Sequence, residues 1–291
     1  SPKTAGLYFG ALDGFRGLLA VTVAIFHTFW YSHINDTAFF NNGPVIIDLF
    51  FVFSGFLMYV LYGNRMQTAD HAKVFLKRRF ARLYPIHIFM LLVFAAYGLA
   101  RVVAHSAGFS DLNPGEALPF QPGSSENIFS VLTHLTMTHS MGLTDTLTFN
   151  PPSWTISVEF FAYFTFVLMF MRFRPTKSWH FALIAVGISL IYAGLATVKP
   201  NMDITYDLGF FRCLGGFYTG ILAAWAYGNI ASRKSSKVVQ SNLLIMTALE
   251  VVTLASFITP TEAIRQMAKE IIGEEKDTHN IQYTLGATYF F

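Results

Sequence analysis

Charged residues are scarce in this chain, and cysteine is almost absent. Lysine, arginine, aspartate and glutamate together make up 13% of the 291 residues, about half of the share that is usual in soluble domains. The single cysteine, Cys213, excludes an intrachain disulfide and any cysteine-rich metal site. The sequence also lacks internal repeats, glycine-rich phosphate loops and nucleic-acid-binding motifs. We therefore expect neither a soluble domain nor a nucleic-acid partner.

The chain instead contains several long apolar segments. Apolar residues are 53% of the chain, and the mean hydropathy is +0.45. A helix needs about 18 to 20 apolar residues to cross a bilayer. The sequence predicts an all-α, polytopic integral membrane helical bundle of about 8–10 transmembrane helices, with one re-entrant or interfacial segment, that forms a single domain over 1–291. The clear predicted spans are 12–31, 45–62, 83–104, 154–171, 180–198, 208–228 and 242–259.

The gaps between lysine and arginine residues predict the orientation of these spans. None occurs in 28–64 or in 102–171, whereas six fall within 65–82. Basic clusters mark the cytoplasmic side, so the connections at 32–44, 105–153 and 199–207 are expected to face outward. This orientation holds only if 128–143 does not cross the membrane, which favours a re-entrant or interfacial segment there.

Three ionisable residues lie in the first apolar segment. Eleven residues separate Arg16 from His27, which in an α-helix is about 16.5 Å of rise and about 1100° of turn. The two side chains are therefore expected on nearly the same helical face, and Asp13 shares that stripe. Ionisable groups in a span are costly unless they face a protein interior or a wet cavity. The stripe predicts one wall of a polar passage.

Four sequence blocks, in this order along the chain, resemble the bacterial membrane-bound acyltransferase-3 family, whose members acylate cell-surface glycans. The first block pairs Arg16 with His27, which matches the family's Arg-x10-His pattern. The other three are DLFFVFSGFL at 48–57, FLKRRFARLYP at 75–85 and PSWTISVE at 152–159. Family members usually have about ten spans, whereas this chain shows seven clear ones. The C-terminal part is therefore expected to be truncated.

The resemblance implies a membrane-bound O-acyltransferase. The expected reaction moves an acyl group, with acetyl the expected group, from cytoplasmic acyl-CoA to a hydroxyl of a cell-surface or exported polysaccharide, or of a lipid-linked sugar. Acyl-CoA is then a donor substrate, no cofactor is expected, and the expected location is the bacterial cytoplasmic (inner) membrane. The alternative is a transporter or exporter of a small anionic or glycan-linked solute. Such transporters often have inverted-repeat halves, which this sequence does not show.

The expected donor site consists of arginines. Their side chains bind phosphate through forked, charge-assisted hydrogen bonds. Arg78, Arg79 and Arg82 lie at the inner mouth of the predicted third span, and Arg16 lies just inside the first. Arg78 and Arg82 are one helical turn apart, so both can point the same way. The alternative is that this cluster only sets the membrane topology.

The expected catalytic residues are His27, Glu159 and Arg16. A neutral imidazole can take a proton from an acceptor hydroxyl or carry the acyl group itself. Glu159, in the span after Trp154, is expected to orient His27 or to stabilise its charged form. The alternatives are a buried structural histidine and a structural carboxylate paired with Arg212.

Two further histidines raise the question of a metal site. His134 and His139 are five residues apart, which does not place them on one helical face. No acidic residue stands at metal-ligand spacing from them. The sequence therefore predicts no metal site.

Overall fold

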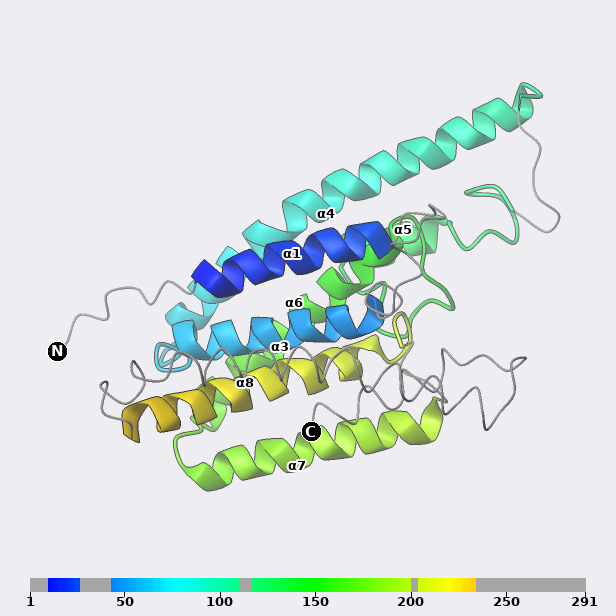
Figure 1. Ribbon diagram of the computed structural model, residues 1–291. Coiled ribbons are helices and arrows are strands. Elements are labelled where there is room, and N and C mark those ends of the chain that lie inside the picture. The colour runs from blue at the N-terminus through cyan, green and yellow to red at the C-terminus, as the bar shows by residue number, and fades with distance from the viewer. Residues whose placement is uncertain (1–9, 27–42, 110–116, 200–203, 234–291) are drawn as a thin grey trace. The chain divides into compact units, whose positions relative to one another are not determined.

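Helices are the only regular elements in the part of the chain that the structure describes. This computed structural model describes residues 10–26, 43–109, 117–199 and 204–233, and it confirms the predicted all-α class (Figure 1). Three helical segments are long and apolar enough to cross a membrane, namely Ala69–Ser106, Pro151–Arg172 and Ser178–Val198.

Most predicted spans correspond to helices whose bounds differ from the prediction by a few residues. The exceptions are 242–259, which lies outside the described residues, and 83–104, which forms part of a longer helix. The matching helices are α1 (Gly10–Phe26), α3 (Gly43–Tyr62), α6 (Trp154–Arg172), α7 (Ser178–Val198) and α8 (Gly209–Arg233).

Helix α4 (Ala69–Ser106) is much longer than the predicted third span. It has 38 residues, which corresponds to about 57 Å. Its N-terminus is capped by Thr68, whose side-chain oxygen accepts a hydrogen bond from the His71 main-chain N–H at 3.3 Å. Pro85 lies inside the helix and removes one helical hydrogen-bond donor. The basic residues at 77–82 therefore lie inside the helix, just before the predicted span 83–104.

The chain divides into two compact units. One unit contains α1, α3 up to Leu57 and α8 from Thr219. The other contains α4, α5 (Ile128–Leu135), the 3-10 turn η1 (Pro151–Ser153), α6 and α7 up to Leu195, together with the end of α3 and the start of α8.

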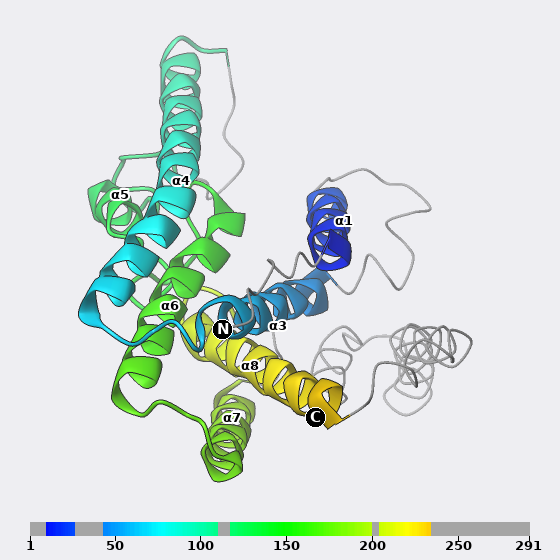
Figure 2. The same cartoon turned by 90° about the vertical axis from the view of Figure 1, so that its left-hand side faces the viewer.

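In the second unit, α4 and α6 pack against each other (Figure 2), and aromatic side chains fill their contact. Phe75, early in α4, contacts Tyr163 and Phe166 in the later half of α6, with ring centroids 5.8 and 5.6 Å apart. Phe217 of α8 completes this core and is fully buried. Aromatic pairs of this kind contribute about 0.5–1.5 kcal/mol beyond area burial.

Helix α5 lies beside the middle of α4 and is too short to cross a bilayer, as predicted for 128–143. Its start is a capping box in which Asn127 and Ser130 satisfy each other's main-chain N–H groups. Its end is held by the Tyr84 hydroxyl of α4, which donates to the Leu135 carbonyl at 3.1 Å. The connection between α4 and α6 thus returns to the level of residues 84–87.

The unit that contains α1 depends on a close approach of two backbones. A Cβ atom added to Gly220 of α8 would collide with the main chain of α3 at the Val52 carbonyl. One helical turn along α3, Phe56 contacts Tyr227 at 6.2 Å between ring centroids. Small residues at helix contacts are typical of membrane bundles because they let backbones approach.

Candidate functional site

The residues of the predicted first-span stripe fall at the edge of what the structure describes. Helix α1 carries Asp13 and Arg16 on a continuous helical backbone, as the predicted register requires. The side chains of both residues and the whole of His27 lie outside the described residues. Their convergence remains a prediction.

The basic cluster of α4 separates into two environments. Arg78 and Arg82, one turn apart, are both exposed, in agreement with the prediction that they can share a face. Arg79 points the other way and is only 9% exposed. The three arginines therefore form an exposed pair and one buried member.

Aromatic rings surround the buried guanidinium of Arg79. Its central carbon lies 5.2 Å from the ring centroid of Tyr62, 5.4 Å from that of Phe75 and 5.7 Å from that of Tyr163. Cation–π contacts are strongest when the cation is removed from water. Among the described residues, Arg79 has no carboxylate partner, and its Nε atom is buried without a hydrogen-bond partner. The site therefore offers a largely buried positive charge that has no carboxylate partner among the described residues.

Tyr163 connects this charge to the predicted catalytic carboxylate. Its hydroxyl donates a hydrogen bond of 2.6 Å to Oε1 of Glu159, one turn earlier in α6. Tyr163 is the tenth of the 19 residues of α6, so Arg79 lies level with the middle of that helix. The structure thus brings Arg79 and Glu159 together through one tyrosine, whose role the sequence analysis did not predict. The four-residue spacing from Glu159 was the available signal.

Arg212 is the residue that would pair with Glu159 if that carboxylate had only a structural role. It lies near the start of α6. Its guanidinium is 5.5 Å from the Trp154 ring, and its Nη1 donates to the Ile204 carbonyl at 3.2 Å. The side chain is 1% exposed. Arg212 therefore packs the beginning of α6 against the segment that precedes α8.

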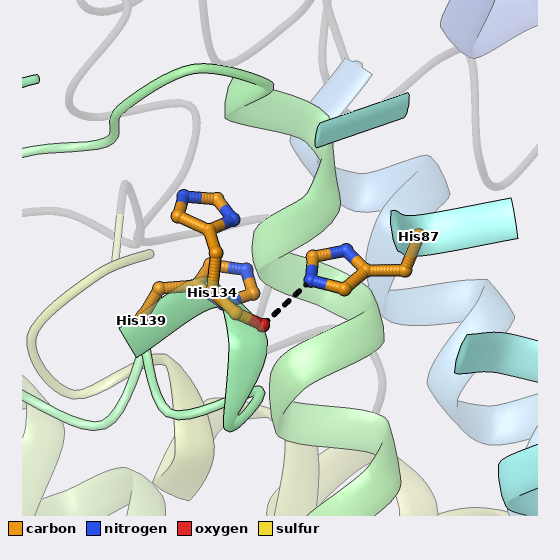
Figure 3. Close-up of side chains that lie close together, drawn as sticks. All are labelled: His87, His134 and His139. Atoms are coloured by element: carbon orange, nitrogen blue, oxygen red, sulfur yellow. Dashed lines mark hydrogen bonds between the residues drawn. The ribbon is translucent and has the colours of Figure 1, made fainter. Parts of the chain in front are cut away.

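A cluster of three histidines, which the sequence analysis did not predict, occupies the junction of α4, α5 and α6 (Figure 3). The rings of His134 and His139 stack at 3.9 Å between centroids. His87 of α4 lies 5.6 Å from the first ring and 5.2 Å from the second, nearly parallel to both. All three side chains are at most 4% exposed.

The backbone explains why two histidines five residues apart meet. Helix α5 ends at Leu135, and Met137 follows with φ +57°, a left-handed conformation that reverses the chain. The Ser157 hydroxyl of α6 holds this turn by donating to the Met137 carbonyl at 2.6 Å. His139 therefore folds back over His134. No sequence signal links them to His87, which is 47 residues earlier than His134.

Burial strongly disfavours protonation of two of these histidines. Burial, followed by the charges that His139 and His87 would carry, lowers the pKa of His134 to about 3, against hydrogen bonding to Thr148. Burial, followed by the charge of His87, lowers the pKa of His139 to about 4, against hydrogen bonding to the Ser153 carbonyl. Both imidazoles are therefore neutral at physiological pH.

Comparison with known proteins agrees with the motif resemblance. The family described as "Acyltransferase domain" matches residues 9–291. "Protein 2 in picA locus" of Rhizobium radiobacter is 36% identical over 91 residues, which are 30% of this chain and 44% of that protein. "Acyltransferase MdmB" of Streptomyces mycarofaciens is 29% identical over 149 residues, which are 50% of this chain and 33% of that protein.

These matches differ in how much of each protein they cover, and the coverage decides which of them shows the family. No solved structure matches the chain. The matched regions span less than half the length of either curated relative. The family match, in contrast, covers nearly every residue, including the basic segment of α4 and the start of α6. On that evidence the chain belongs to the acyltransferase-3 family.

Proposed function

We propose that this chain is a membrane-bound O-acyltransferase that moves an acyl group, with acetyl the expected group, from cytoplasmic acyl-CoA to a polysaccharide hydroxyl outside the cell. The observation that carries the proposal is the buried guanidinium of Arg79, enclosed by aromatic rings and without a carboxylate partner among the described residues. A buried charge is costly unless it is paired. A phosphate group of the donor would supply the missing anion.

The exposed pair of α4 extends this donor site. Arg78 and Arg82 lie one turn apart on the accessible side of the helix, where further phosphate oxygens of CoA would reach them. Arginine forks bind phosphate in a bidentate manner. The arrangement therefore supports a donor with several phosphate oxygens in preference to a simple acyl anion.

Glu159 and His27 are the proposed transfer residues. His27 takes the proton of the acceptor hydroxyl while that oxygen attacks the thioester carbonyl, and CoA leaves as the thiolate. In the covalent variant, His27 first receives the acyl group and then passes it to the acceptor. Glu159, hydrogen-bonded to Tyr163, stabilises the charged imidazole, and Arg16 adds positive charge to the donor end of the same passage.

The motif resemblance and the charge pattern support the proposed acceptor and location. The resemblance implies a glycan acceptor, and the basic clusters of this chain favour a donor side in the cytoplasm of a bacterium. The proposed acceptor is a cell-surface or exported polysaccharide, or its lipid-linked precursor, at the outer face of the inner membrane.

Labelled acetyl-CoA tests the proposal. Purified protein in lipid nanodiscs is incubated with the labelled donor, with and without a bacterial glycan extract, and both CoA release and label transfer are followed. Arg79→Gln should weaken donor binding by about 10- to 150-fold, as expected for loss of a charged partner worth about 1.5–3 kcal/mol. Arg65→Gln, at an exposed position outside the aromatic enclosure, is the matched control.

The competing outcomes are distinct. Equal donor affinity in Arg79→Gln and wild type would contradict the donor site. Complete inertness toward acetyl-CoA, with and without glycan, would instead favour the export of a small anionic or glycan-linked solute.

A further inference from the structure

The hydrogen bonds of the histidine cluster fix the tautomers of its rings. The Nε2 atom of His87 donates to the His134 carbonyl at 2.9 Å. The Nε2 atom of His139 donates to the Ser153 carbonyl at 3.1 Å. A carbonyl only accepts, so both Nε2 atoms carry hydrogen and both Nδ1 atoms carry a lone pair. The third ring bonds through Nε2 to the Thr148 hydroxyl at 3.1 Å, which is compatible with the same tautomer.

All three Nδ1 atoms are buried without a hydrogen-bond partner in the described part of the chain. Buried polar atoms are nearly always satisfied, and an unsatisfied one costs about 1–3 kcal/mol. Three buried lone pairs lie at one place, on three histidines that are at most 4% exposed. This arrangement favours a shared electron-pair acceptor, such as a metal ion. Simple packing would be served better by apolar rings.

We propose that His87, His134 and His139 form a binding site for a divalent transition metal ion, and that Zn²⁺ is the ion that fits it. One nitrogen of each histidine lies within 4.8 Å of one nitrogen of the other two. Neutral imidazole is a common zinc ligand, and three histidines with one open position form a well-known zinc geometry.

The carbonyl contacts supply the outer support that such a site needs. Histidines that bind metals usually donate their other ring N–H to a carbonyl or carboxylate, which orients the ring. His87 and His139 both show this pattern. The hydroxyl of Ser153 accepts from His139 as well, because its own proton is donated to the Asn150 carbonyl at 2.7 Å.

Metal binding requires a defined movement of the rings. Their planes are parallel to within 13°, whereas a metal ion lies in the plane of each ring that binds it. Nitrogen ligands around Zn²⁺ stand about 3.4 Å apart, from bonds of about 2.1 Å at tetrahedral angles. Two nitrogens 4.8 Å apart would have to approach by about 1.4 Å. Rotation about the side-chain bonds would have to unstack His134 from His139 and bring the Nδ1 atoms toward one point.

Zinc binding is measured on the whole chain in nanodiscs after chelation. We expect one Zn²⁺ per chain, an increase in the unfolding temperature on zinc addition, and visible absorption of tetrahedral type when Co²⁺ replaces Zn²⁺. These readouts do not depend on acyl transfer, so they stand or fall separately from the proposed enzyme activity.

Substitution by glutamine isolates the ligand role from the structural one. In His87→Gln and in His139→Gln, the side-chain amide N–H can replace the Nε2–H donor, while the Nδ1 ligand is lost. Each change should weaken zinc binding by at least about 100-fold, the upper end of the effect of losing a supporting contact. His71→Gln, at an exposed position of α4, should leave it unchanged.

Two results would overturn the proposal. One is the failure of the chelated wild-type chain to take up Zn²⁺ at micromolar free metal. The other is unchanged zinc affinity in either folded glutamine variant, which would assign the ion to other members of the nine histidines in the chain. Should one variant fail to fold, the other variant and the wild-type measurement still decide the question.

Discussion

Tyr163 contacts both Arg79, a proposed donor-binding residue, and Glu159, a proposed transfer residue. Its ring faces the Arg79 guanidinium at 5.7 Å, and its hydroxyl donates to Glu159 at 2.6 Å. A bound donor phosphate would change the field at the ring, and the hydroxyl would transmit that change to the carboxylate. The contributions of the ring and of the hydroxyl of Tyr163 can therefore be tested separately.

Glu159→Gln keeps the shape of the side chain but removes its charge. If the carboxylate stabilises a charged imidazole, the variant should lose most of its turnover and keep nearly full affinity for acyl-CoA. Steady-state transfer and donor binding, measured on the same preparation, separate the two effects. Tyr163→Phe is the companion variant, because it removes only the hydroxyl and should reduce turnover less. Wild-type turnover in Glu159→Gln would remove the carboxylate from the mechanism.

His27 is the residue on which the proposed mechanism depends most. General-base catalysis contributes typically about 10²–10⁴-fold, so His27→Ala should bind acyl-CoA yet lose nearly all transfer. His27→Gln should fail equally, since an amide takes neither the proton nor the acyl group. Label that appears on wild-type protein without acceptor, and disappears in the variant, would identify a covalent acyl carrier. Retention of more than about a tenth of the transfer rate by His27→Ala would contradict both roles.

At the scale of elements, the contact between α3 and α8 depends on a missing side chain. In Gly220→Ala, the new Cβ would collide with the α3 main chain at Val52, so we expect a lower unfolding temperature and poorer recovery of folded protein. Gly228→Ala is the matched control in the same helix, because no atom lies within 4 Å of its added Cβ. That change should be neutral or stabilising by up to about 1 kcal/mol. Equal unfolding temperatures of the two variants would contradict the close approach.

The elements that the sequence predicted well are those whose apolar run is as long as the helix. Helices α3, α6 and α7 agree with their predicted spans to within two residues at each end. Helix α4 does not, because its first 14 residues carry five of the basic residues, which lower hydropathy without disfavouring a helix. The hydropathy pattern located the part of α4 at 83–104 and could not locate its start.

The candidate site was predictable only where it is local in sequence. The register of Arg78 with Arg82, and of Glu159 with Tyr163, follows from one helical turn. The burial of Arg79 could not be predicted, because it depends on which aromatic side chains from α3 and α6 lie against α4. The histidine cluster required a left-handed residue at Met137 and a partner on another helix, neither of which the spacing reveals.

Because His134 and His139 are buried, we expect the free energy of unfolding of the chain to depend on pH. Because the pKa values of His134 and His139 are about 3 and about 4 in the folded chain, only the unfolded chain gains these protons as the pH falls below about 6.5. The contribution of these two histidines to the free energy of unfolding is therefore fully present above that pH, and it is lost progressively as the pH falls toward about 4 for His139 and about 3 for His134. The expected loss is about 2 kcal/mol per histidine between pH 7 and pH 5.

Thermal unfolding of chelator-treated protein at a series of pH values checks this dependence. His134→Gln should show a shallower fall of the unfolding temperature with decreasing pH than the wild type. His71→Gln, which changes an exposed histidine, should keep the wild-type slope. Parallel curves for all three proteins would show that the cluster does not control acid stability.

The contacts of the connection between α4 and α6 also determine an order of assembly. Chains are synthesised from the N-terminus, so residues 117–150 emerge before α6. The Met137 carbonyl is nevertheless held by Ser157, and the His139 ring by Ser153, at the start of that later helix. We therefore expect the connection between α4 and α6 to complete these contacts only after α6 has been synthesised. Its docking would then be a late step in the biogenesis of this protein.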